Sequence, residues 1–114
     1  MKVIVEDSAK NNILNIFSYN STYSIKNAIE TNMDIQAYIN DLAESSYIGR
    51  YVPEIKDKHF REIIYRKTRH SIYRIIYYIS ETSKTIYVLN VLNNKKDFNQ
   101  FLKLNNYFKN FFRI

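Results

Sequence analysis

Four short runs between Gly49 and Phe98 decide the fold of this chain: GRYVPEI at 49–55, FREIIY at 60–65, YRIIYYI at 73–79 and IYVLNVLNNKKDF at 86–98. The last three runs are rich in isoleucine, valine and tyrosine, the residues that favour strands. Arg61 and Arg74 lie within them, and a buried arginine without a partner is costly, so each must pair with an acid or face a partner molecule. The runs therefore predict a turn followed by three strands that carry two arginines.

Length and composition limit the class of protein. With 114 residues the chain is long enough for one domain with a modest core, so 1–114 is treated as a single domain. The absence of cysteine excludes a disulfide framework and a cysteine-ligated zinc site, and it favours a reducing cytoplasm. We expect no signal peptide and no membrane span, because no apolar run is long enough. The single glycine, Gly49, and the single proline, Pro53, mark the one strong break, and few positions in the fold can require positive φ.

The N-terminal part predicts a short strand and a pair of helices. Residues 2–6 alternate between polar and apolar, and Ser8 can cap the helix that follows. A polar cluster at 20–22 separates this helix from a second one that ends near Ala43. The positions expected to face the core are Ala9, Ile13, Ile16 and Phe17 in the first helix and Ile25, Ala28, Ile29, Asn32, Ile35, Ile39 and Leu42 in the second. The two helices are predicted to form an αα-hairpin with an acidic outer face.

The remainder predicts an antiparallel meander. A loop over 45–58 precedes strands at 60–65, 72–80 and 85–92, with polar turns at 66–70 and 81–84 and a final aromatic helix from about 97 to 114. In the middle strand Ile72, Arg74, Ile76 and Tyr78 share one face, and Tyr73, Ile75, Tyr77 and Ile79 share the other. Neither face is polar, so this strand is expected to be central and covered on both sides. The predicted class is α+β, with the strand and αα-hairpin packed on an antiparallel sheet.

Charge is distributed unevenly along the chain, whose net charge is +6. Residues 1–48 carry three lysines against six acids, a net charge of −3, whereas residues 49–114 carry fourteen basic residues against five acids, a net charge of +9. A basic half of this kind attracts polyanions or an acidic protein partner. The alternative is a solvated, lysine-rich face without a partner, which would show the same excess of basic residues.

The residues expected to bind a target are the basic ones of the strands and their ends: Arg61, Arg66, Lys67, Arg69, Arg74, Lys95 and Lys96. Together with Tyr65, Tyr73 and Tyr77 they could clamp phosphates and stack bases. The alternative is that Arg74 pairs with Glu62 across the sheet and that the tyrosines belong to the core. No metal or cofactor is expected, since His59 and His70 are the only histidines and the chain has no glycine-rich phosphate loop.

The order of the motifs resembles the RelE/ParE superfamily, the toxins of bacterial type II toxin–antitoxin modules. The similarity rests on the G-R-Y-V-P-E turn at 49–54, Arg61-Glu62, the Y-R-I pattern at 73–75 and the strand end V-L-N-N-K-K-D at 91–97. It implies the RelE/ParE fold, in which the sheet face that carries Arg74 would meet the target. It also implies a cognate antitoxin as partner.

Two branches of the superfamily imply different chemistry. RelE-type members cleave messenger RNA on the ribosome without a metal, and the resemblance gives Arg61, Arg74, Lys96 and His70 as the candidate catalytic residues. Their usual strand lysine and late tyrosine fall on apolar residues here, at 63–64 and 101–102. The turn and the strand end look more like the ParE branch, whose members poison DNA gyrase. The expected function is therefore a gyrase-binding toxin, with a RelE-type ribonuclease or a degenerate, non-toxic binding protein as alternatives.

The C-terminal segment FNQFLKLNNYFKNFFRI at 98–114 is apolar on two helical faces. A core this small cannot cover both faces. The surplus is expected to bind the antitoxin or a second copy of the chain; the alternative is a wider contact with the core and a frayed end. The candidate antitoxin contacts are Phe101, Phe108, Phe111 and Phe112.

Overall fold

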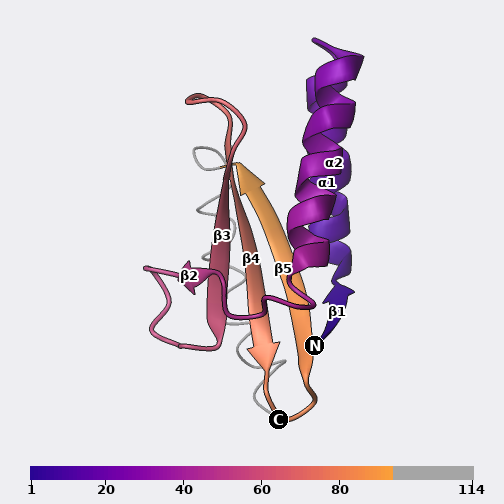
Figure 1. Ribbon diagram of the computed structural model, residues 1–114. Coiled ribbons are helices and arrows are strands. Elements are labelled where there is room, and N and C mark those ends of the chain that lie inside the picture. Colours follow the sequence, from indigo (N-terminus) through magenta and orange to yellow (C-terminus); the bar gives the residue numbers. More distant parts are fainter. Residues whose placement is uncertain (94–114) are drawn as a thin grey trace.

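The structure is a computed structural model that describes residues 1–93 of the chain. Two helices, α1 (Asp7–Ser21) and α2 (Ile25–Asp41), lie side by side on one face of a five-stranded sheet, as Figure 1 shows. The strands are β1 (Lys2–Val5), β2 (Arg50–Tyr51), β3 (Phe60–Arg66), β4 (Ile72–Ser80) and β5 (Thr85–Asn93). Their order across the sheet is β1-β5-β4-β3-β2, so β4 is the central strand, as predicted. The α+β class with an αα-hairpin on a sheet is confirmed.

The sheet is mixed rather than wholly antiparallel. β3, β4 and β5 form the predicted antiparallel meander, but β1 joins the far edge in parallel to β5, with Lys2 opposite Thr85. The two-residue strand β2 lies inside the segment expected to be loop and pairs antiparallel with the start of β3. The prediction missed β2 because two residues give no alternating pattern.

The core has one apolar layer on each face of the sheet. Between sheet and helices lie residues from α1, α2, β3, β4 and β5: Ala9, Ile13, Ile35, Ile39, Leu42, Tyr65, Tyr73, Ile75, Tyr77, Ile79, Ile86, Val88 and Val91. On the opposite face Val52, Ile55, Phe60, Ile76, Leu89 and Leu92 are buried together. The predicted division of β4 is therefore confirmed, since Tyr73, Ile75, Tyr77 and Ile79 all face the helices.

Two positions of α2 were assigned wrongly. Ile25 and Ile29 were expected to face the core, but they are 66% and 46% exposed, and Thr31 is buried instead. The helix pair extends beyond the sheet at the end where α1 turns into α2, so the first turns of α2 have no sheet beneath them (Figure 1). The cap of α2 is Ser24, whose Oγ accepts a hydrogen bond from the Asn27 N–H at 3.1 Å.

Polar residues of α1 form hydrogen bonds with groups at a β-bulge in β5. The register between β4 and β5 shifts after Ile76, so that Leu89 is an extra residue on β5. The Oδ1 atom of Asn12 accepts hydrogen bonds from the Val91 N–H at 3.1 Å and from Asn90 Nδ2 at 2.9 Å. Ser8, expected to cap α1, instead donates its Oγ–H to the Leu89 carbonyl at 2.6 Å, because α1 already begins at Asp7. These contacts attach α1 to the bulge and satisfy its backbone groups.

The predicted helix over 97–114 lies outside the described residues, so this part of the expectation stays a prediction. Within residues 1–93, neither helix has the length and apolar character that a membrane crossing needs.

Candidate functional site

The turn at Gly49 requires glycine because other residues approach its Cα closely, and not because its φ is positive. The Gly49 N–H donates to Tyr77 Oη at 2.9 Å, and Tyr77 Oη–H donates to the Ser46 carbonyl at 3.0 Å. A Cβ atom at position 49 would lie 2.6 Å from Tyr77 Oη and 2.7 Å from the Glu62 carbonyl oxygen. Glycine is therefore required for space. Within residues 1–93 the positive φ, 53°, belongs to Lys84 in the turn between β4 and β5.

Arg61 holds the same turn from the side of β3. Its Nη1 donates to the carbonyls of Gly49 at 2.8 Å and Tyr47 at 3.2 Å. Its guanidinium carbon also lies 4.7 Å from the ring centre of Tyr51 and 5.3 Å from that of Tyr47, as in cation–π contacts. The arrangement gives Arg61 a structural role, because its Nη1 donates to two backbone carbonyls and its guanidinium lies near two tyrosine rings of the chain.

Arg74 lies in an ion-pair network with Arg50, Glu54 and Glu62, which we call the arginine–glutamate network. Arg74 Nε donates to Glu62 Oε1 at 2.7 Å, and Arg74 Nη2 donates to Glu54 Oε1 at 2.8 Å. Arg50 Nε donates to the other Glu62 oxygen, Oε2, at 2.8 Å. The side chain of Arg74 is 5% exposed and that of Glu62 is fully buried. The pairing of Arg74 with Glu62, the alternative weighed from the sequence, is the arrangement found.

Burial and pairing act oppositely on Arg74. Desolvation works against its charge, but the hydrogen bonds to Glu54 and Glu62 raise the pKa of Arg74 above its ordinary value. Two guanidinium groups and two carboxylates balance in charge, so the network places no net charge on this part of the sheet. A target could reach Arg74 only if these ion pairs opened.

The three tyrosines proposed to stack on bases are core residues. Tyr65, Tyr73 and Tyr77 are buried between the sheet and the helices, at 5%, 4% and 0% exposure. Burial raises the pKa of Tyr77, and burial together with the Asp34 carboxylate raises that of Tyr65. The stacking expectation was wrong, because strand alternation points all three rings at the helices.

Residues 66–70, which comprise the last residue of β3 and most of the turn to β4, carry exposed basic groups; we call this segment the hairpin tip. It projects past the end of the sheet (Figure 1). Arg66, Arg69 and His70 are exposed, and Arg69 Nε donates to His70 Nε2 at 3.2 Å. Lys67 is more enclosed, since its Nζ lies 3.3 Å from Glu30 Oε2 and 3.8 Å from Asp34 Oδ2 of α2. The hairpin tip is thus attached to the helices by one lysine and exposes two arginines.

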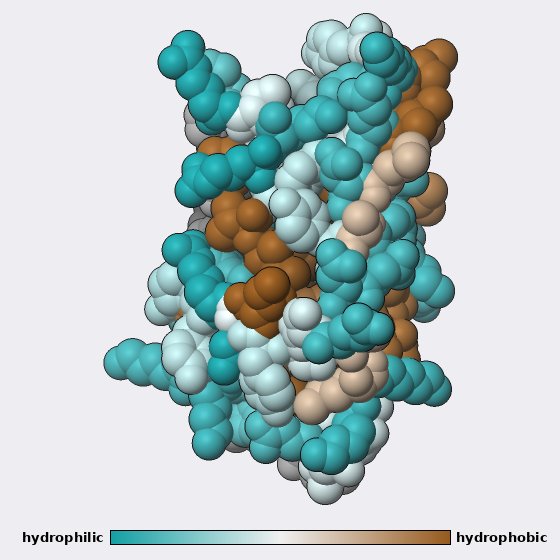
Figure 2. Space-filling view, viewed as in Figure 1, coloured by the Kyte–Doolittle hydropathy of each residue, from teal (hydrophilic) through white to brown (hydrophobic). Residues whose placement is uncertain are grey.

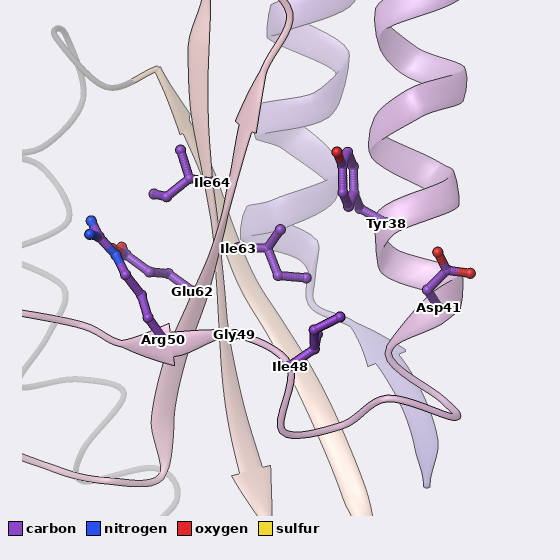
Figure 3. A pocket seen from close by; sticks show the side chains of 8 residues that line it. All are labelled: Tyr38, Asp41, Ile48, Gly49, Arg50, Glu62, Ile63 and Ile64. Carbon is purple, nitrogen blue, oxygen red and sulfur yellow. The ribbon is translucent and has the colours of Figure 1, made fainter.

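A pocket of about 310 Å³ lies between β3 and the end of α2 (Figure 3). It is lined by Tyr38, Asp41, Ile48, Gly49, Arg50, Glu62, Ile63 and Ile64. Figure 2 shows apolar side chains in the middle of the face that is viewed. No pattern in the sequence indicates this pocket, because its apolar residues come from a helix, a loop and a strand and share no periodicity.

Comparison with known proteins identifies the family. Residues 3–98 match the family described as the ParE toxin of the type II toxin–antitoxin system parDE. The chain belongs to the ParE toxin family. Among solved structures it is similar to a chain of the chromosomal ParDE toxin–antitoxin system from P. aeruginosa, with a TM-score of 0.66 and 14% identity. The similarity covers 82% of this chain and 95% of the other. No curated protein sequence matches the chain.

The motifs that suggested the ParE toxin family are thus largely motifs of the fold. The G-R-Y-V-P-E turn supplies the close glycine and two members of the arginine–glutamate network, and Arg61-Glu62 and Arg74 complete these contacts. Of the residues expected to bind the target, the structure brings Arg66, Lys67 and Arg69 together at the hairpin tip and holds Arg61 and Arg74 in internal contacts. Lys95 and Lys96 and the four candidate phenylalanines, Phe101, Phe108, Phe111 and Phe112, lie outside the described residues.

Proposed function

We propose that this ParE-family toxin arrests growth by binding DNA gyrase, and that a cognate antitoxin neutralises it in the cytoplasm. The observation that carries the choice of binding over cleavage is the placement of the arginines. Two of the four candidate catalytic residues, Arg61 and Arg74, are held in contacts inside the chain. A third, His70, lies on the exposed hairpin tip.

RNA cleavage without a metal needs a base and cations gathered around one phosphate. Arg61 contacts the turn at Gly49, Arg74 lies in the buried arginine–glutamate network, and His70 lies on the hairpin tip. This separation does not favour a shared phosphate site. Binding needs only accessible charge, which the hairpin tip provides through Arg66 and Arg69. We propose the hairpin tip, together with Lys95 and Lys96, as the target contact.

The antitoxin is proposed to contact the C-terminal phenylalanines. The excess of basic residues over 49–114 would steer an acidic partner, and the phenylalanine rings would supply desolvated anchors. Replacing Phe108 and Phe112 with serine is expected to weaken antitoxin affinity more than it lowers thermal stability. Unchanged affinity in calorimetry with a collapsed melting temperature would assign these rings to the core.

The function is tested by inducing the chain in cells and following growth, DNA breaks and messenger RNA decay separately. Growth arrest with DNA breaks that a gyrase-resistant host does not show supports the proposal. Arrest with rapid messenger RNA cleavage would establish the RelE-type ribonuclease instead. Normal growth with soluble expression would mean that the chain is a degenerate toxin. Rescue by co-expression of the protein encoded beside it would identify the antitoxin.

A further inference from the structure

The edge of the sheet formed by β1 is open. β1 is the first strand in the order β1-β5-β4-β3-β2, and β5 pairs with its inner edge. Figure 1 shows β1 at the border of the sheet, beside the start of α1. Within residues 1–93, no strand pairs with the outer edge of β1. Such an edge offers backbone N–H and C=O groups to another extended chain.

The pairing with β5 shows which backbone groups of β1 point outward. The N–H of Glu6 donates to a carbonyl of β5 at 2.9 Å, and that of Lys2 donates to the carbonyl just before β5 at 3.2 Å. Successive residues of a strand direct their N–H and C=O groups to opposite edges. The backbone groups of Val3 and Val5 therefore point away from β5 and could pair with a further strand.

Opposite charges stand at the two ends of this extended stretch, residues 2–6, which we call the edge segment. Lys2 is exposed at its start. Glu6 at its end keeps an extended backbone, with φ −69° and ψ 156°, and its side chain does not cap α1. Among the ion pairs formed within residues 1–93, neither Lys2 nor Glu6 takes part. Both charges are therefore available to a partner.

The edge segment is complementary to a second copy of itself. When two copies run antiparallel about a two-fold axis at Ile4, Val3 lies opposite Val5 of the second copy, and their outward backbone groups form hydrogen-bonded pairs. The same register places Lys2 opposite Glu6 of the second copy, at both ends of the pairing. A shift by two residues would break both charge pairs. Charge and backbone direction thus select the same register.

Apolar side chains would be covered on both faces of this pairing. Val3 and Val5 are partly buried against the core on the helix side, as is Ile16 of α1. Ile4, also partly buried, points to the opposite face of the sheet. A second copy would extend the apolar layer past β1 and bring the two Ile4 side chains together at the axis. Covering this surface would release water from it.

We propose that two copies of the chain pair antiparallel through the edge segment, so that their two sheets join into one continuous sheet. Main-chain hydrogen bonds of Val3 and Val5 would supply affinity, and the two Lys2–Glu6 pairs would fix the register. The two-fold axis limits the assembly to two copies, because each open edge is used once. The pairing requires neither the target nor the antitoxin.

Exchanging the charges tests the register. Sedimentation velocity of the purified, untagged full chain, at concentrations up to about 1 mM, should show a monomer–dimer equilibrium. Lys2→Glu and Glu6→Lys should each weaken the dimer about tenfold at low salt, because like charges then face each other at both ends. The variant with both changes should recover the dimer to within about threefold, because the charge pairs form again with reversed polarity. Lys26→Glu is the control, since Lys26 is exposed on α2, outside the edge segment.

Three results of this experiment would overturn the proposal. The first is a chain that stays monomeric up to about 1 mM. The second is an equal effect of the Lys2 and Lys26 variants at unchanged melting temperatures, since net charge and not the register would then control association. The third is a dimer that none of these changes affects, which would belong to another surface.

Val3→Pro and hydrogen exchange test the backbone pairing. Proline is tolerated where the N–H of an edge strand points outward, so this variant should keep the ladder to β5 and lose the dimer. A folded proline variant that dimerises as tightly as the unchanged chain would overturn the pairing. In the unchanged chain, the amides of Val3 and Val5 should exchange several-fold more slowly at concentrations where the dimer predominates. A dimer without this protection would also overturn the proposal.

Discussion

The arginine–glutamate network and the hairpin tip are both rich in arginine, but they are opposites in burial and pairing. In the network Arg74 is 5% exposed and shares two glutamates with Arg50. At the tip Arg66 and Arg69 are exposed, and no carboxylate lies within 4 Å of either guanidinium among the ion pairs of residues 1–93. The arginines of the network form ion pairs that connect the sheet with the turn and loop that follow Gly49. The arginines of the hairpin tip are accessible to solvent or to a partner.

The difference separates fold from target binding. Breaking a buried pair leaves a desolvated charge, which destabilises the fold strongly, whereas removing an exposed charge changes stability little. Substitutions in the two regions should therefore give opposite combinations of stability and activity.

Arg74→Ala should cause the largest loss of stability. It removes one of the two arginines that pair with the buried Glu62, and it removes the arginine that pairs with Glu54 within residues 1–93. We therefore expect the free energy of unfolding to fall by about 3–5 kcal/mol. Urea unfolding monitored by circular dichroism measures this change. A loss below about 1 kcal/mol, together with lost toxicity, would show that Arg74 serves the target and would undo the comparison.

Gly49→Ala should be the next most damaging change. The new Cβ would lie 2.7 Å from the Glu62 carbonyl oxygen, and this backbone atom cannot move without disturbing β3. We expect a loss of about 1–3 kcal/mol, the usual cost of overpacking. Adding Tyr77→Phe should recover only part of the loss, because it removes the hydroxyl contact and leaves the carbonyl contact. Full recovery in the double variant would mean that the hydroxyl alone requires glycine.

Asn12→Ala should cost an amount in the same range as Gly49→Ala, about 1–3 kcal/mol, because it leaves the Val91 N–H and the Asn90 amide without their acceptor. Asn11→Ala is the matched control, since Asn11 is the neighbouring exposed residue of the same helix. Thermal unfolding of both variants measures the difference. Equal melting temperatures would show that water replaces the acceptor.

The sequence predicted the parts of this fold that depend on local pattern. The isoleucine, valine and tyrosine runs gave β3, β4 and β5, and the two faces of β4 were assigned correctly. It failed where tertiary geometry decides. Ile25 and Ile29 have helical spacing but lie beyond the sheet, and the fate of Arg74 depends on a loop that brings Glu54 to it. The pocket needed three separate elements to meet, which no single segment could signal.

The smallest change in stability is expected at the hairpin tip. Arg66→Gln combined with Arg69→Gln should alter the free energy of unfolding by less than about 0.5 kcal/mol, because both side chains are exposed. The same variant should lose most of its growth inhibition if the proposed target is correct, since a gyrase–DNA complex would present a strongly negative surface to exposed arginines. Lys56→Gln with Lys58→Gln is the control, because it removes two exposed positive charges from the loop before β3 and leaves the tip unchanged. If both double variants reduce toxicity equally, net charge alone steers the toxin to its target; if only the tip variant does so, at an unchanged melting temperature, the tip is a contact and the comparison between the two arginine-rich regions holds.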